Sequence, residues 1–297
     1  MQAAKPLVRV EQHARAWRMD VEDVRETETS VIAFGTRELT VGTSRHQPVV
    51  LKVVKSPGDE WRSGEILAAF DGHGVARVYE HEPGAVLLER LQPGNSLVDL
   101  ALNGKDEEAT DILAGVIRQM SARASDLSAP ESPQGCATLL DWAKGFDRYL
   151  ATGNDQIPTD LAAAGRRVYE TLCASERRPI LLHGDLQHYN VLFDLDRGWL
   201  AIDPKGVVGE IEYEIGAALR NPFEQPELFL AQATVKRRLK QFTDKLNLDY
   251  ERTLGWTFAQ AVLSAIWSIE DGFAVDATNS SLRLAEVVRP MLGDFPP

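Results

Sequence analysis

The sequence contains little cysteine and no long apolar run. Its two cysteines, Cys136 and Cys173, form no CxxC pair and have no histidine at zinc-ligand spacing. Neither a disulfide framework nor a structural zinc site is therefore implied. The N-terminus lacks the apolar run of a signal peptide, and no uncharged stretch of about 18 apolar residues occurs. We expect a cytoplasmic protein that does not enter a membrane.

Clustered positive charge is also missing. The chain has 32 Lys and Arg against 44 Asp and Glu, a formal net charge of -12. Binding to nucleic acid needs clustered Lys and Arg that release phosphate counterions, so a nucleic-acid partner is not expected. The acidic balance is compatible with a cationic substrate, although acidity that only keeps a protein soluble is more common.

The 297-residue chain divides into a β-rich part and a helix-rich part. Its length favours one large domain or two lobes that share a cleft. β-Branched residues predict strands, and periodic apolar residues predict helices. The strands are expected at 29–34, 38–41, 48–54, 75–80 and 84–91, with one helix within 55–71. Helices are expected at 107–124, 139–150, 161–175, 227–246, 251–271 and 282–291, interrupted by strands within 179–204.

The Pro93-Gly94 turn marks the boundary between these two parts. The prediction is an α+β protein with an N-terminal β-rich lobe over residues 1–91 and a C-terminal helical lobe over 92–297. The oligomeric state does not follow from the sequence.

The most informative stretch is 180–206. An apolar strand leads into His183-Gly184-Asp185, and Asn190 follows four residues later, where a second strand begins. A return strand then ends at Asp203. Singly, each of these polar residues is more often a turn or cap residue. Their joint occurrence at this spacing favours a catalytic interpretation.

The predicted hairpin places two metal ligands together. If its turn centres between residues 196 and 197, Asn190 and Asp203 face each other across the strand pair. An amide oxygen and a carboxylate at that separation can share Mg²⁺, which takes one or two protein oxygens plus phosphate oxygens. Asp185 would lie beside the metal and accept the proton of an attacking hydroxyl group.

The spacing His-x-Asp-x-x-x-x-Asn, followed by an Asp at a strand end, resembles the catalytic loop of the protein kinase superfamily. More narrowly, the chain resembles the aminoglycoside/hydroxyurea antibiotic resistance kinases over about residues 25–275. The matching segments are LHGDL (182–186), WLAIDPKG (199–206), YEIG (213–216) and RNP (220–222). The family often has His and a small residue where this chain has Gln187 and Tyr189, on the loop near the substrate.

The resemblance implies a protein kinase-like two-lobed fold with ATP between the lobes. It implies an ATP- and Mg²⁺-dependent kinase that phosphorylates a hydroxyl group of a small molecule such as streptomycin. Three other functions stay open: a kinase of an endogenous hydroxylated metabolite, a pseudokinase and a protein Ser/Thr kinase. The last is disfavoured because no Ala-Pro-Glu segment follows Asp203.

The resemblance also implies residues that bind the phosphates of ATP. Lys52, on an apolar strand, matches the phosphate-binding lysine of the family. Glu65, on the following helix, is the expected ion-pair partner of Lys52, with Glu60 as the alternative. The chain has no GxGxxG loop, and Thr29 and Ser30 are the candidate phosphate-loop residues.

Further residues are implied at the hinge and in the catalytic loop. Glu89 and Leu91 match the segment between the lobes whose backbone hydrogen-bonds adenine. His183 matches a histidine that is structural in the resembling kinases, so we expect it to brace the loop while Asp185 acts as the base.

Acidic residues are the candidates for the substrate side. Trp267, Glu270 and Asp271 lie on a late helix and could hold guanidinium or ammonium groups by charge-assisted hydrogen bonds. Glu210, Glu212 and Glu214 could do the same. For this run, however, a solvated acidic face is the expectation.

Overall fold

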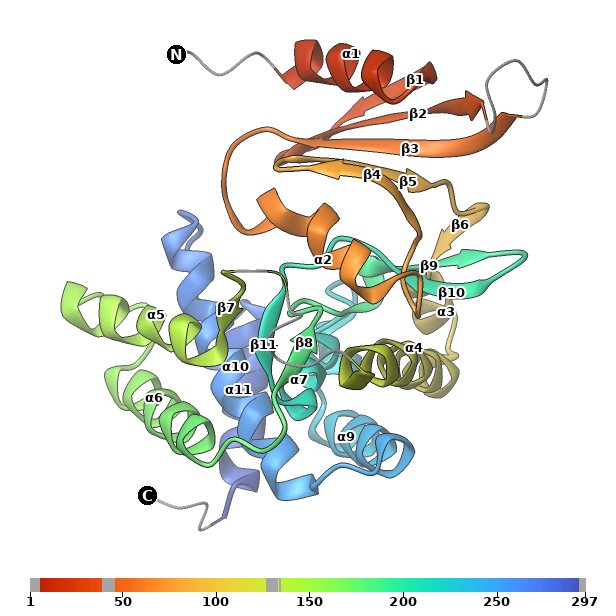
Figure 1. Cartoon of the computed structure of the whole chain (residues 1–297). Helices are drawn as coiled ribbons and strands as arrows, with labels where there is room; N and C mark the ends of the chain where they lie inside the picture. The colour runs from red at the N-terminus through yellow and green to blue at the C-terminus, as the bar shows by residue number, and fades with distance from the viewer. Residues whose placement is uncertain (1–5, 39–45, 127–132, 134, 294–297) are drawn as a thin grey trace.

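The computed structural model describes residues 6–38, 46–126, 133 and 135–293. Its upper lobe is built on an antiparallel sheet and its lower lobe is mainly helical (Figure 1). The sheet has the spatial order β1-β2-β3-β5-β4. Its strands are β1 (Met19–Glu26), β2 (Ser30–Glu38), β3 (His46–Val54), β4 (Val78–Glu82) and β5 (Ala85–Glu89). The predicted α+β, two-lobed architecture is confirmed.

One face of this sheet is covered by the helix α1 (Pro6–Ala16), which the sequence analysis missed. Val49, Leu51 and Val53 alternate along β3 and pack against Val10 and Ala14 of the helix. β1 was also missed, because Met19 is its only buried residue. A largely exposed, charged edge strand carries no alternating apolar signal.

β2 differs from its prediction at Gly35. We expected a break there, but the strand continues through this residue to Glu38. A Cβ atom at Gly35 would lie 2.0 Å from the carbonyl oxygen of Asp20, so glycine permits the close approach of β1. Residues 39–41 of the predicted next strand lie outside the described residues.

The predicted helix after β3 begins later than expected. A 3₁₀ turn, η1 (Asp59–Arg62), precedes α2 (Ser63–Phe70), and Asp71 ends the helix with φ of +51°. Ile66, Leu67 and Phe70 of α2 belong to the same buried core as lower-lobe residues such as Leu113 and Ile117. Packing of α2 therefore fixes η1 relative to the lower lobe.

Helices make up most of the lower lobe. They are α3 (Leu97–Leu102), α4 (Asp106–Asp126), α5 (Leu139–Thr152), α6 (Thr159–Ala174), α7 (Ile215–Leu219), α8 (Pro226–Phe229), α9 (Gln232–Leu246), α10 (Tyr250–Glu270) and α11 (Ser280–Val288), with a final 3₁₀ turn η5 (Arg289–Met291). The helix expected at 227–246 is interrupted between α8 and α9.

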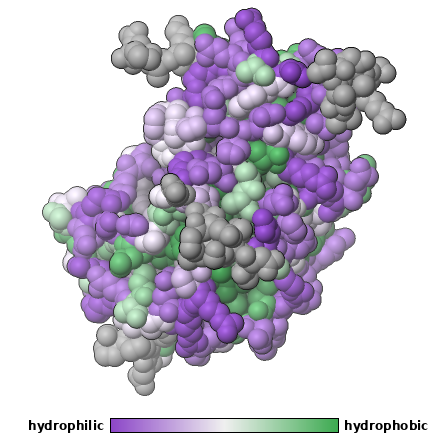
Figure 2. Space-filling model, in the orientation of Figure 1, coloured by the Kyte–Doolittle hydropathy of each residue, from purple (hydrophilic) through white to green (hydrophobic). Residues whose placement is uncertain are grey.

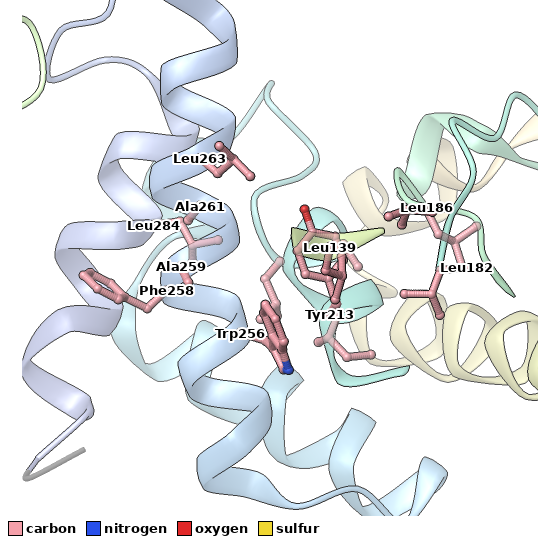
Figure 3. Close-up of a cluster of buried hydrophobic side chains, with 14 of the residues drawn as sticks. Leu139, Leu182, Leu186, Tyr213, Trp256, Phe258, Ala259, Ala261, Leu263 and Leu284 are labelled. Atoms are coloured by element: carbon pink, nitrogen blue, oxygen red, sulfur yellow. The ribbon is translucent and has the colours of Figure 1, made fainter. Parts of the chain in front are cut away.

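α10 lies at the centre of the lower lobe. Trp256, Phe258 and Leu263 point from it in different directions, toward Tyr213 on one side and α11 on the other (Figure 3). A helix that buries most of its circumference carries a weak amphipathic pattern and acts as a central support.

Two small sheets carry the residues singled out above. One has the order β10-β9-β6, and the other has the order β7-β11-β8. Their strands are β6 (Pro93–Ser96), β7 (Ala137–Thr138), β8 (Ile180–Leu182), β9 (Val191–Asp194), β10 (Gly198–Ala201) and β11 (Val207–Gly209). The 3₁₀ turns η3 (His188–Asn190) and η4 (Ile211–Glu214) flank them.

The surface is mostly hydrophilic on the face in Figure 2, with hydrophobic residues showing in its middle. Among the described residues, no helix is long and apolar enough to span a membrane.

Candidate active site

His183 directly follows β8 and braces the loop after it. Its Nδ1 accepts a hydrogen bond from the backbone N–H of Asp185 at 3.3 Å, so Nε2 carries the proton and donates to the carbonyl of Ile202 at 2.8 Å. The ring is fully buried, and this burial lowers its pKa. Both ring nitrogens are occupied, so the geometry matches the expected bracing role and leaves none for a substrate proton.

Asp185 is held by a residue that sequence reasoning missed. Its Oδ1 accepts a hydrogen bond from Nη2 of Arg220 at 2.9 Å, and Nη1 of Arg220 donates to Gln260 of α10 at 3.0 Å. The Asp185 side chain remains 23% exposed, so solvent and ligands can reach the carboxylate. Arg220 lies 35 residues away along the chain, and its only sequence signal was the family-like Arg-Asn-Pro segment.

Asn190 and Asp203 do not face each other, so the predicted hairpin register is wrong by one residue. β9 pairs with β10 so that Val191 lies opposite Ala201, and the Asn190 carbonyl accepts from the N–H of Ile202 at 2.9 Å. The turn centres on Asp196, because Asp194 lies opposite Gly198, whose φ is +76°.

Asp203 reaches the site through its backbone conformation. Its φ of +58° is a left-handed conformation, which turns the chain directly after the strand pair. Asn190 reaches the same region through its amide, whose Nδ2 donates to the carbonyl of Asp185 at 2.9 Å. This bond leaves the amide oxygen of Asn190 to accept another partner.

Lys52 lies between two carboxylates. Its Nζ is 2.8 Å from Oε2 of Glu60 and 2.9 Å from Oδ1 of Asp203. Burial alone would lower the pKa of Lys52, but Asp203 and Glu60 outweigh it and raise the pKa above its usual value. The lysine is therefore a permanent cation.

The partner of Lys52 is Glu60 rather than Glu65, the residue we had favoured. Glu65 instead pairs with Arg62 at 2.8 Å. The reason is the late helix start, because η1 and not α2 is the segment that lies next to Lys52. Spacing along the sequence could not distinguish the two glutamates.

A cleft of about 480 Å³ extends from this ion-pair group. Thr29 lines it, on the tight turn between β1 and β2, together with Glu60, Lys205 and Asp271. Ser30 lies beneath the cleft, because its hydroxyl is buried and 3.4 Å from Oε2 of Glu60.

Of the two predicted hinge residues, Glu89 uses its N–H and its carboxylate within the protein. The N–H of Glu89 donates to the carbonyl of Arg77 at 3.0 Å, and its carboxylate accepts from Arg77 N–H and from Arg197. The N–H of Glu89 is thus not available to an adenine ring. Leu91 is buried in a small apolar cluster with Ala76 and Leu200.

A second cavity of about 240 Å³ adjoins the substrate-side residues. Trp267, Glu270 and Asp271, the candidates at the late helix, all line it. Arg148 binds both carboxylate oxygens of Glu270, at 2.8 and 3.0 Å, and so offsets its charge. Burial raises the pKa of Asp271, the charge of Lys205 acts against this effect, and the carboxylates of Asp59, Glu270 and Glu28 add to it.

Four residues of this cavity, Arg148 among them, were missed because they come from other segments. Trp142 of α5 meets Trp267 edge to face, with ring centroids 5.2 Å apart. Asp59 of η1 and Asp141 of α5 add carboxylates. The cavity therefore combines aromatic walls with acidic side chains from three elements.

The expectation of a solvated acidic face is wrong for Glu210 and Glu214. Glu210 is buried and accepts hydrogen bonds from Arg252 and from the indole N–H of Trp256, at 2.5 and 3.0 Å. Glu212 is partly buried, which raises its pKa.

Glu214 holds the catalytic loop itself. Its two carboxylate oxygens accept the backbone N–H groups of His183 and Gly184, at 2.8 and 3.0 Å. Burial raises the pKa of Glu214 to about 7. The regular spacing of Glu210, Glu212 and Glu214 was the one sequence signal that could have suggested that two of these side chains face the interior.

The two departures from the family motif both stabilise the loop. The side-chain oxygen of Gln187 accepts from the N–H of Tyr189 at 3.1 Å. The Tyr189 hydroxyl donates to Glu224 at 2.6 Å, and its ring stacks on Phe223 at 5.5 Å.

A sequence model of the aminoglycoside/hydroxyurea antibiotic resistance kinases matches residues 21–272. The chain belongs to this family. The match covers both lobes and every residue of the site described above, which confirms the predicted family and makes the protein a small-molecule kinase.

Curated members of the family are similar to this chain over most of their length. The streptomycin 3''-kinase of Klebsiella pneumoniae is 36% identical over 230 residues, covering 76% of this chain and 81% of the relative. The hydroxyurea phosphotransferase of Kitasatospora aureofaciens is 32% identical over 259 residues, covering 81% and 71%.

Solved structures share the fold of this chain at lower sequence identity than the curated relatives. Aminoglycoside phosphotransferase APH(4)-Ia, in a complex with ADP and hygromycin B, has a TM-score of 0.64 at 16% identity, covering 96% of this chain and 98% of that one. Choline kinase LicA from Streptococcus pneumoniae has a TM-score of 0.59 at 14% identity, covering 95% and 97%. These likenesses establish the fold alone.

Proposed function

We propose that this protein transfers the γ-phosphoryl group of ATP to a hydroxyl group of a small cationic molecule, with Mg²⁺ as the metal. The observation that carries the proposal is the convergence of three groups in one region. Asp203 pairs with Lys52 at 2.9 Å, and the Asn190 amide donates to the backbone carbonyl of Asp185 at 2.9 Å. His183 connects these two sides, because its ring bonds the N–H of Asp185 and the carbonyl of Ile202, the residue before Asp203.

The donor set fits Mg²⁺ bound together with phosphate. Within the described residues, no group of three or more His, Cys, Asp or Glu side chains could hold a metal ion by itself. Asn190 and Asp203 supply an amide oxygen and a carboxylate, and Mg²⁺ commonly takes one or two protein oxygens plus phosphates. When bound, the metal would neutralise charge on the phosphate oxygens.

Asp185 is proposed as the base. Arg220 and the N–H donated to His183 fix its orientation, so the carboxylate can receive the hydroxyl proton without reorganising. Lys52 would orient the phosphates, with Glu60 and Asp203 holding its ammonium in place. Thr29 lies where the turn between β1 and β2 can cover them.

The substrate class follows from the second cavity. Its carboxylates can bind ammonium or guanidinium groups, and Trp142 and Trp267 provide aromatic faces for cations. An aminoglycoside such as streptomycin fits this chemistry, and so does an endogenous amino sugar or amino alcohol. A pseudokinase is disfavoured because the described site retains Lys52, Asp185, Asn190 and Asp203 together.

The test is acceptor-dependent formation of ADP from ATP across matched pairs of hydroxylated compounds that differ by one amino group. Streptomycin, other aminoglycosides, choline, hydroxyurea and neutral sugars complete the panel. Turnover that requires Mg²⁺ and favours the cationic member of each pair is expected. If no acceptor raises ADP formation above that of Asp185→Asn, the proposal is wrong.

A further inference from the structure

Lys205 lines the cleft and has no role in the proposed function. It lies two residues after Asp203, and its backbone N–H donates to the carbonyl of His183 at 3.0 Å. Its side chain lines the cleft of about 480 Å³ together with Thr29 and Glu60. The same side chain carries its ammonium 5.2 Å from the ring centroid of Trp267. The ammonium thus lies between the nucleotide side and the acceptor side.

Two other lysines near this cleft have partners at shorter distances. Lys52 binds two carboxylates at 2.8 and 2.9 Å. Lys55 donates to the carbonyl of Thr27 at 2.5 Å and pairs with Glu26 at 2.7 Å. Lys52 is thus fixed in place by its two carboxylates, and Lys55 is held against the turn between β1 and β2.

Lys205, by contrast, is held weakly. Its carboxylate partner, Asp59, lies 3.4 Å away with a side chain that is 73% exposed. An exposed ion pair of this kind is weak because solvent screens it, and a single contact between the ammonium and the partly buried ring of Trp267 is also modest. A phosphate group, with more charge and several acceptor oxygens, would displace both contacts.

We propose that Lys205 is a further catalytic residue, whose ammonium contacts the non-bridging oxygens of the phosphoryl group in transfer. This inference rests on the proposed function. During transfer, a bond forms between the acceptor oxygen and the γ-phosphorus while the bond from that phosphorus to the bridging oxygen breaks. ADP leaves with the electron pair, and Asp185 takes the hydroxyl proton. Lys205 exchanges no proton and stabilises the charge on the moving group.

A binding experiment separates this contact from a structural role without needing an acceptor. Lys205→Met keeps the side-chain stem and removes the charge. With Mg²⁺, we expect its dissociation constant for ADP to stay within about twofold of wild type. Its affinity for the non-hydrolysable β,γ-imido analogue of ATP should fall about tenfold, because only that ligand presents the γ-phosphate. Titration calorimetry measures both.

Kinetics provide the second readout, once an acceptor is known. Loss of one donor to developing charge lowers kcat by about 10²–10³-fold, so Lys205→Met should show that loss while the KM of the acceptor changes little. Lys205→Arg should recover part of the rate. Lys240→Met is the control, since Lys240 pairs with Asp244 along the exposed face of α9.

Two outcomes overturn the assignment. Equal weakening of ADP and the imido analogue, in a variant with a wild-type melting temperature, would mean that Lys205 only shapes the cleft. Unchanged binding of both nucleotides would mean that it does not touch the γ-phosphate. Absence of turnover in the wild-type protein would instead contradict the proposed function, while leaving the nucleotide comparison valid.

Discussion

Lys52, Glu60 and Asp203 come from three separate segments, and their contacts decide which glutamate matters for the nucleotide. Glu60→Gln removes one of the two carboxylates that hold the lysine, so the ammonium should become less well oriented. We expect the KM for ATP to rise about fivefold with a smaller change in kcat. Steady-state kinetics with varied ATP measures this effect.

Glu65→Gln is the matched control for that prediction. Its partner, Arg62, is one-third exposed, and such pairs contribute little. A larger effect from Glu65→Gln than from Glu60→Gln would show that Lys52 changes partner when nucleotide binds.

The carboxylate of Asp185 is accessible to a substrate, whereas the ring of His183 is buried. Asp185→Asn keeps the shape of the side chain but cannot take a proton, so kcat should fall by about 10²–10⁴-fold with nearly unchanged ATP affinity. His183→Gln should act mainly on stability, because both ring nitrogens bind the backbone. Single-turnover kinetics of the two variants tests this pair.

The reverse result would reassign the base. If His183→Gln lost the chemical step while remaining folded, and Asp185→Asn retained it, the histidine would have to carry the proton.

At the scale of elements, the loop after β8 depends on η4. Glu214 receives two backbone N–H groups of this loop, one on each carboxylate oxygen. In Glu214→Gln only one acceptor oxygen remains, and an amide N–H meets a backbone N–H. We expect the free energy of unfolding to fall by about 1–3 kcal/mol and kcat to fall with it. Urea unfolding at neutral pH measures the first effect.

Glu212→Gln is the control within the same turn. Burial raises the pKa of Glu212, so replacing it with a neutral side chain should not destabilise the fold. Similar losses in the two variants would mean that the turn itself, rather than its bonds to the catalytic loop, is sensitive to substitution.

The hairpin β9–β10 differs from its prediction by one residue of register. Because its turn centres on Asp196 rather than between residues 196 and 197, the partner of Asn190 is residue 202 and not residue 203. A one-residue change of register alters which side chains face each other. The left-handed backbone of Asp203 then returns its carboxylate to the site.

At the scale of the whole molecule, a buried histidine links folding to pH. His188 lies in the interior with both ring nitrogens unpaired, and burial, aided by the charge of Arg238, lowers its pKa to about 3. The unfolded chain takes up this proton near pH 6.5, whereas the folded protein does not. Above pH 6.5, His188 is neutral in both states and does not lower the free energy of unfolding. As the pH falls from 6.5 toward 3, only the unfolded chain is protonated at His188, and the free energy of unfolding decreases.

The expected loss is measurable by comparing variants at two pH values. Between pH 8 and pH 5, His188 should destabilise the fold by about 2 kcal/mol. In His188→Leu, which cannot titrate, the decrease in unfolding free energy over this range should be smaller by about that amount. Equal decreases in the two proteins would show that His188 is protonated, or solvated, in the folded state.

The sequence by itself determined the features that depend on neighbours along the chain. Alternating and periodic apolar residues predicted β3, β5 and most lower-lobe helices, because each needs only one buried face. The compact motif from His183 to Asp203 predicted the catalytic loop and the family for the same reason, since its residues lie within one short stretch.

Tertiary structure decided the contacts between segments that lie far apart. The choice of Glu60 over Glu65, the bond from Arg220 to Asp185, and the burial of Glu210 and Glu214 all depend on how η1, η4 and α10 pack. Local spacing leaves several partners within reach of each charged side chain. Only the shared core beneath α2 and around α10 brings one of them to bonding distance.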